Sequence, residues 1–143
     1  MHAGIEWLVD GHDCSPARLR DRAAVVGVLD RLVGDMGLRV VSTAVHVFPG
    51  EGGVTAMYLL EESHLTIHTF PETGTATLNA YCCRPREAPR WRAVLGEFLG
   101  AREVRVSEHT RGGHPVSEAN TSVQPSASRG DRDGAPGPGT GAP

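Results

Sequence analysis

The fold of this chain is decided by residues 54–83, which read VTAMYLLEESHLTIHTFPETGTATLNAYCC. Three runs within it, 54–60, 64–70 and 75–83, are rich in Val, Ile, Thr and aromatic residues, and Glu, Pro and Gly separate them. Such runs with short polar connections are typical of β-strands joined by hairpins. The stretch therefore predicts three consecutive strands that pair antiparallel.

Three further segments outside this stretch also predict strands. They are the short apolar run 5–9, the Val-rich run 38–48 and the alternating segment 104–107. With a helical segment after the first strand and another before the last, the order favours an α+β fold. We expect a mainly antiparallel sheet with two helices packed on one face.

The first of the two predicted helices begins at Ser15 and Pro16, which are typical N-cap and first helical residues, and ends near Gly37. A second helix is expected over 89–99, where large apolar residues recur at helical spacing. The stripe that the first helix is expected to bury consists of Leu19, Ala23, Val26, the Leu29 or Asp30 neighbourhood, Val33 and Met36.

Length and charge exclude several function classes. The 143 residues suit one domain, which we place at 1–112, and the Gly/Pro/Ser-rich segment 113–143 is expected to be a disordered tail. A net charge of -3 shows no basic excess for nucleic acid. No apolar run approaches the roughly 18 residues of a membrane span, and no export signal begins the chain, so a cytoplasmic protein is expected.

Cysteine usage agrees with a reducing compartment. The three cysteines, Cys14, Cys82 and Cys83, are odd in number and lack CxxC spacing, so the sequence predicts neither a disulfide framework nor a zinc site.

The middle strand carries the candidate chemistry. Strand alternation puts His64, His68 and Phe70 on one face and turns Leu65 and Ile67 toward the helices. A metal site is disfavoured, because two residues at this spacing lie about 13 Å apart along a strand. A serine hydrolase is also disfavoured, since no G-x-S-x-G elbow is present.

A third chemistry is self-cleavage at Ser63. Its hydroxyl can attack the preceding carbonyl, that of Glu62, to form an ester, after which loss of the Ser63 α-proton expels the acyl group and leaves a pyruvoyl end. The residues permit this reaction without selecting it.

A family resemblance favours the third chemistry. The run ESHLTIHTFPE, preceded by GVTAMYLLE and followed eleven residues later by Cys83, resembles the short prokaryotic form of S-adenosylmethionine decarboxylase, a self-cleaving pyruvoyl enzyme. The segments WLVDGHDCSPARL and VRVSEHTRG are similar to the family's first and last strands. The resemblance spans about residues 5 to 112.

The resemblance implies cleavage between Glu62 and Ser63, giving a β chain of residues 1–62 and an α chain that begins at 63. Ser63 would become the pyruvoyl cofactor, which accepts the substrate amine as a Schiff base and serves as electron sink. His68 would act as the processing base and Thr55 would assist it. Cys83, preferred to its neighbour on the family match, would return a proton to the decarboxylated substrate.

Substrate residues match the family less well. Phe48 approximates an aromatic that stacks on adenine, and Glu72 is either a contact to the ribose or amine or a turn residue. Phe70 stands where the family usually has Trp, and Asn79 stands where it usually has an acidic residue. Residues 84–86 (RPR) replace the glycine that usually follows the cysteine. A decarboxylase of S-adenosylmethionine for spermidine biosynthesis is expected. The alternatives are a decarboxylase of ornithine or arginine and an unprocessed, non-enzymatic paralogue.

Family members are homodimers in which two sheets face each other, so the resemblance also implies a layered α/β/β/α sandwich with substrate sites between protomers. A domain of this size is too small to enclose a nucleoside alone.

Overall fold

The structure is a computed structural model that describes residues 4–113; the predicted tail therefore lies, from 114 onward, outside the described residues. The elements are β1 (Gly4–His12), α1 (Pro16–Arg20), α2 (Arg22–Met36), β2 (Val40–Val47), β3 (Val54–Leu60), β4 (Ser63–Phe70), β5 (Thr75–Cys82), α3 (Trp91–Leu99) and β6 (Glu103–Arg111).

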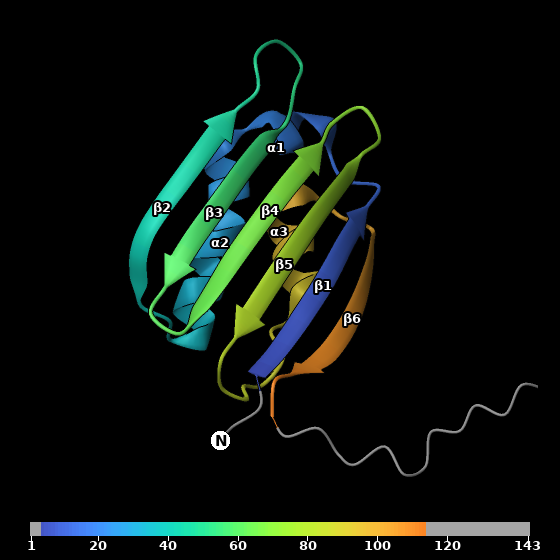
Figure 1. Cartoon of the computed structure of the whole chain (residues 1–143). Helices are drawn as coiled ribbons and strands as arrows, with labels where there is room; N and C mark the ends of the chain where they lie inside the picture. Colours follow the sequence, from blue (N-terminus) through green and yellow to red (C-terminus); the bar gives the residue numbers. More distant parts are fainter. Residues whose placement is uncertain (1–3, 114–143) are drawn as a thin grey trace, which may run out of the picture.

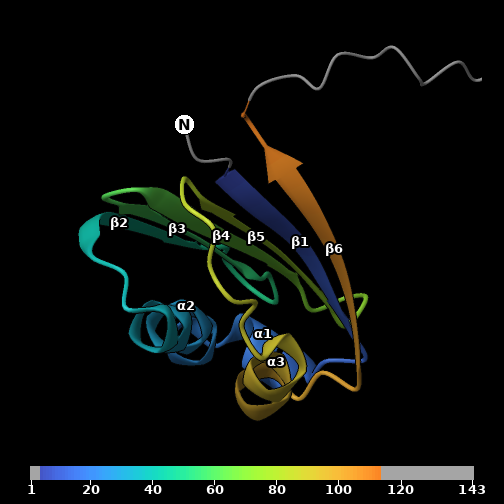
Figure 2. The ribbon, with the colours of Figure 1, turned by 90° about the horizontal axis from the view of Figure 1, so that it is seen from below.

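The six strands form one sheet in the order β2-β3-β4-β5-β1-β6, and each neighbouring pair is antiparallel (Figure 1). The three strands predicted from residues 54–83 are consecutive neighbours in it. The first strand lies between β5 and β6, so it joins the central hairpins to the last strand. All three helices lie on one face of the sheet (Figure 2). The predicted α+β fold is confirmed.

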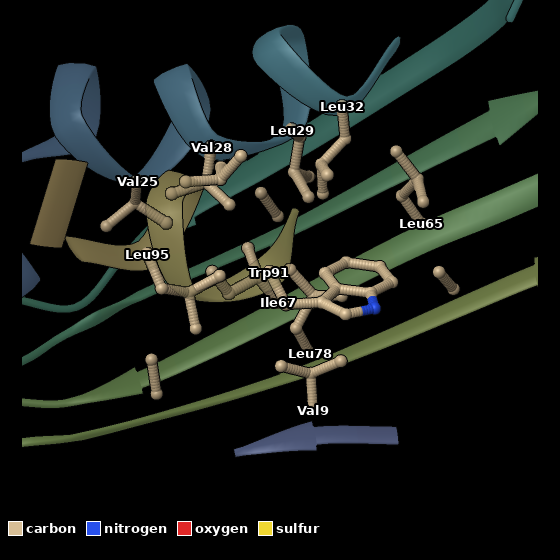
Figure 3. Close-up of a cluster of buried hydrophobic side chains, with 14 of the residues drawn as sticks. Val9, Val25, Val28, Leu29, Leu32, Leu65, Ile67, Leu78, Trp91 and Leu95 are labelled. Atoms are coloured by element: carbon tan, nitrogen blue, oxygen red, sulfur yellow. The ribbon is translucent and has the colours of Figure 1, made fainter. Parts of the chain in front are cut away.

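The core lies between this face and the helices (Figure 3). Leu65 and Ile67 of β4 are fully buried there, as strand alternation predicts, and Trp91 of α3 packs among them. In each central strand, apolar side chains alternate with more exposed ones, so one side of the strand is buried and the other side is exposed. From α2 and α3 the core receives Val25, Val28, Leu29, Leu32, Val94, Leu95 and Leu99.

The first predicted helix is in fact two helices, so the prediction of two helices in all was wrong. Asp21 is extended (φ -84°, ψ 111°), and its amide donates to the Arg18 carbonyl while its carboxylate accepts from Ala23 N at 3.0 Å. An Asp side chain that binds nearby backbone in this way competes with helix continuation. The predicted ends, an N-cap at Ser15 and a left-handed C-cap at Gly37, are confirmed.

This break changes the face that α2 buries. Ala23 is exposed, so the predicted stripe was wrong at this position, whereas Val26, Val33 and Met36 are partly buried and pack against the core. The α2 side chains that are fully buried are Val25, Val28, Leu29 and Leu32.

We call the side of the sheet opposite the helices the open face. Leu8, Met57 and Leu59 are exposed on it, and within residues 4–113 no helix covers it. A groove of about 480 Å³ runs over β2, β3 and β4 on this side, lined by Ser42, Thr43, Ala44, Met57, Tyr58, Leu59, His64 and Thr66. The open face is therefore a large, partly apolar surface beside the candidate site.

Candidate functional site

The predicted cleavage bond lies in the tight turn between β3 and β4. Glu61 and Glu62 form the turn, and Ser63 opens β4, where it pairs with Cys82 of β5. The Cys83 amide donates to the Glu62 carbonyl oxygen at 2.8 Å. The carbonyl that Ser63 would attack is thus already hydrogen-bonded to a backbone N–H.

Ser63 faces the helices, on the same side of β4 as Leu65, and is only 8% exposed. Its Oγ has no hydrogen-bond partner among the residues that the structure describes. A cavity of about 140 Å³ adjoins the turn, lined by Gly37, Leu38, Arg39, Glu61, Glu62, Ser63 and Arg86. A buried hydroxyl without a partner costs about 1–3 kcal/mol, so this serine is held in an unfavourable environment.

Thr55 and His68 form a second group, on the open face. They are direct partners in the β3–β4 register, and Thr55 Oγ1 lies 3.0 Å from His68 Nδ1. His68 follows Ser63 by five residues, so the two Cα atoms are about 16 Å apart along β4 and the side chains point to opposite faces. Within one protomer the Thr55–His68 pair does not reach Ser63.

The predicted substrate residues lie at the His68 end of the sheet. Phe48 is exposed in the loop between β2 and β3, Phe70 is exposed at the end of β4, and Glu72 is exposed in the β4–β5 turn. Both loops project from the same end of the sheet, opposite the turn that contains Glu62 (Figure 1). The structure thus divides the predicted site residues into two groups at opposite ends.

A histidine that the sequence analysis did not select lies in the row of the Thr55–His68 pair. His46 of β2 is the register partner of Thr55, and its ring packs edge-on against Phe48 with centroids 4.6 Å apart. The signal for His46 is the strand register, which places it beside Thr55 on the open face.

A polar network on the same face surrounds His64. Asn79 Oδ1 lies 3.1 Å from His64 Nε2, and Asn79 Nδ2 donates to Glu6 Oε1 at 2.8 Å. Since the amide nitrogen donates to a carboxylate, the amide oxygen accepts, and His64 carries its proton on Nε2. The His64 ring also stacks on Tyr81, with centroids 5.5 Å apart.

Glu6 at the end of this network is held in its charged form. The hydrogen bond from Asn79 is the main cause that lowers the pKa of Glu6; burial opposes it, and the ion pair with Arg111 lowers the pKa further. Neither Glu6 nor Arg111 was selected from the sequence, because their distant positions meet only through the pairing of β1 with β5 and β6.

Two adjacent cysteines differ in exposure. Cys82 is buried in β5, where burial raises the pKa of its thiol, whereas Cys83 is exposed just beyond the strand end. Of the two, Cys83 has the solvent-accessible thiol beside the Glu62 turn.

Within residues 4–113, no group of three or more His, Cys, Asp or Glu side chains could hold a metal ion. No helix in the described part of the chain is long and apolar enough to cross a membrane.

The antiparallel sheet has its helices on one face and a buried serine at the start of β4. These features define a two-layer α+β domain with a candidate self-cleavage turn. Residues 5–112 match the family model described as S-adenosylmethionine decarboxylase. The chain belongs to this family, and the resemblance seen in its sequence is confirmed.

Relatives and a solved structure agree with the family match. The chain is 32% identical over 123 residues to the S-adenosylmethionine decarboxylase proenzyme of Parasynechococcus marenigrum, covering 85% of this chain and 94% of the relative. It is 33% identical over 111 residues to that of Clostridium tetani, covering 76% and 86%. Both names describe proenzymes, which implies self-processing in the family.

The crystal structure of the adenosylmethionine decarboxylase from Aquifex aeolicus superposes with a TM-score of 0.66 at 24% identity, over 80% of this chain and 94% of that one. At this identity the superposition supports the fold.

Proposed function

We propose that this chain is a self-processing, pyruvoyl-dependent decarboxylase that converts S-adenosylmethionine to decarboxylated S-adenosylmethionine for spermidine biosynthesis. The observation that carries the proposal is the turn at Glu62 and Ser63. There a buried hydroxyl, which has no hydrogen-bond partner in the described part of the chain, follows directly after a carbonyl that accepts a hydrogen bond from the Cys83 amide. Family membership supports the same chemistry.

Self-cleavage uses groups at this turn. Ser63 Oγ attacks the Glu62 carbonyl carbon, the peptide C–N bond breaks, and the acyl group passes from nitrogen to oxygen as an ester. As negative charge develops on the carbonyl oxygen, the Cys83 N–H stabilises it, in the manner of an oxyanion hole.

A base then removes the Ser63 α-proton, the Cβ–Oγ bond breaks, and Glu62 departs as a carboxylate that carries Oγ. The end left on the α chain takes up water and releases ammonia, which yields the pyruvoyl group. We assign the base to His68, with Thr55 bonded to its Nδ1 and fixing the ring.

The surroundings of Ser63 fit this product. Ser63 is almost fully buried, and its Oγ has no hydrogen-bond partner within residues 4–113, which suits the methyl group that remains after Oγ has left. The pyruvoyl carbonyl supplies an electron sink for loss of carbon dioxide from an amine substrate. We assign the return of a proton to Cys83, which is exposed beside the turn. The three free cysteines of the chain support a cytoplasmic location.

The division of the site into two groups supports a homodimer. A twofold axis between two facing sheets, perpendicular to the strands, brings the end of one sheet that carries His68 over the main chain of the other at Ser63, whose side chain faces the helices. The apolar side chains Leu8, Met57 and Leu59 give the open face the surface that such an interface needs. We therefore propose an α/β/β/α dimer, with Phe48, Phe70 and Glu72 contacting substrate at the junction.

Intact mass spectrometry and an activity assay test the proposal. The purified protein is expected to separate into fragments 1–62 and 63–143, and Ser63→Ala is expected to stay whole, while the exposed-serine control Ser107→Ala is cleaved. Carbon dioxide should be released from S-adenosylmethionine rather than from ornithine, arginine or lysine. A single 15.2 kDa chain would exclude the pyruvoyl mechanism, and release from ornithine or arginine alone would reassign the substrate.

A further inference from the structure

Glu62, on the carbonyl side of the proposed cleavage bond, is held at two points. Arg84 Nη2 lies 2.8 Å from Glu62 Oε1, and the Cys83 amide binds the Glu62 main-chain oxygen, also at 2.8 Å. Consecutive residues after β5 thus hold the side chain and the carbonyl of the same glutamate. Neither Arg84 nor its ion pair has a part in the function proposed above.

This restraint acts on the turn between β3 and β4. Glu61 and Glu62 lie between β3 and β4, outside the regular ladder, and the Glu61 amide donates to the Arg39 carbonyl at 3.1 Å. The contacts of Glu62 itself lie on the β5 side, through Cys83 and Arg84. Rotation of the Glu62 peptide plane would separate the carbonyl oxygen from the Cys83 N–H.

We propose that Arg84 is a positioning residue for self-cleavage. By binding the Glu62 carboxylate, it keeps the Glu62 carbonyl against the Cys83 amide, in the orientation that Ser63 Oγ attacks. A reaction within a chain depends steeply on how the reacting groups are oriented, so a side chain that narrows this orientation raises the rate without touching the reacting atoms. The inference rests on the proposed self-cleavage.

The same pair has a second consequence once the bond is broken. Glu62 then ends the β chain and carries a new α-carboxylate, whereas Arg84 belongs to the α chain. The ion pair therefore becomes a contact between the two fragments.

The test is the rate of self-cleavage of freshly synthesised full-length chain, followed by mass spectrometry after cell-free translation. Arg84→Ala is expected to slow cleavage about two- to fivefold, the effect of an exposed ion pair, because the two side chains are 66% and 46% exposed. Arg84→Lys should keep most of the rate. In 1 M salt the cleavage rate of the parent chain should fall, while that of Arg84→Ala should change little, since salt screens exposed ion pairs.

A charge exchange separates positioning from a general loss of stability. Glu62→Arg and Arg84→Glu should each slow cleavage, and the double variant should cleave faster than either single variant. Arg31→Ala is the matched control, because Arg31 forms exposed ion pairs with Asp35 and Glu97 away from the turn. Its rate should equal that of the parent.

If the parent chain cleaves and Arg84→Ala cleaves equally fast, or the exchanged pair shows no recovery, Arg84 has no positioning role and the proposed function stands. If the parent chain does not cleave before Ser63 at all, the proposed function fails and this inference fails with it.

Discussion

The buried hydroxyl of Ser63 should destabilise the uncleaved chain, so Ser63→Ala is expected to raise its stability. Ser63 is almost fully buried, and its Oγ is shielded from solvent and has no hydrogen-bond partner within residues 4–113. Removing such a group recovers about 1–3 kcal/mol. Alanine is the poorer strand former and leaves a small void, so we expect a net gain of about 1–2 kcal/mol.

The comparison needs two chains that both stay whole. We therefore place the change in a His68→Ala background and compare His68→Ala with the double variant, after checking by mass that neither is cleaved. Urea unfolding is followed by tryptophan fluorescence, since Trp7 and Trp91 are both buried. With a slope of about 1–3 kcal/mol per M for a small domain, the midpoint should rise by about 0.3–2 M.

The control for this experiment is Ser107→Ala in the same background. Ser107 is exposed, so its removal should change the free energy of unfolding by no more than about 0.5 kcal/mol. An unchanged or lower midpoint for Ser63→Ala would show that the hydroxyl has a partner in the precursor. It would also refute our reasoning that cleavage relieves an unfavourable burial.

Two further predictions concern how the sheet holds this site. Thr69→Val should lower the free energy of unfolding by about 2–4 kcal/mol. The reason is that Thr69 Oγ1 donates to the buried Leu19 carbonyl at 2.7 Å and accepts from the Val54 amide at 2.8 Å. A fall of less than about 3 °C in the unfolding temperature would contradict this. Asn79→Ala should lower the stability of the fold at neutral pH, because the hydrogen bond from Asn79 is the main cause that lowers the pKa of Glu6. A carboxylate whose pKa is lowered in the folded state contributes stability, and this contribution is lost as the pH falls through that pKa. Urea midpoints of parent and variant should therefore converge in acid, and a difference that stays constant with pH would contradict the assignment.

The sheet could be predicted from sequence because burial imposes a period of two on its central strands. Leu65 and Ile67 alternate with polar residues, and each is buried against the helices as the pattern indicates. The break at Asp21 could not be predicted from periodicity, because apolar residues continue at helical spacing on both sides of it. Its cause is local, a carboxylate that binds Ala23 N and begins a new helix.

The site could be predicted only where its residues lie close in the sequence. Ser63, His68 and Cys83 were selected from a single stretch, but the pairing of Thr55 with His68 depends on the register across the β3–β4 turn. The register of β2 likewise adds His46 to the same row. A shift of one residue in such a turn would exchange the faces of a whole strand, so these contacts need the structure.

Sequence proximity is misleading in one respect that bears on mechanism. Ser63 and His68 are five residues apart, yet an extended strand separates them by about 16 Å and turns them to opposite faces. If His68 is the base for Ser63, it cannot serve the serine of its own strand. The short stretch that begins at Ser63 then contributes to two sites, one at each end of β4, and each site is complete only when a second copy covers the open face.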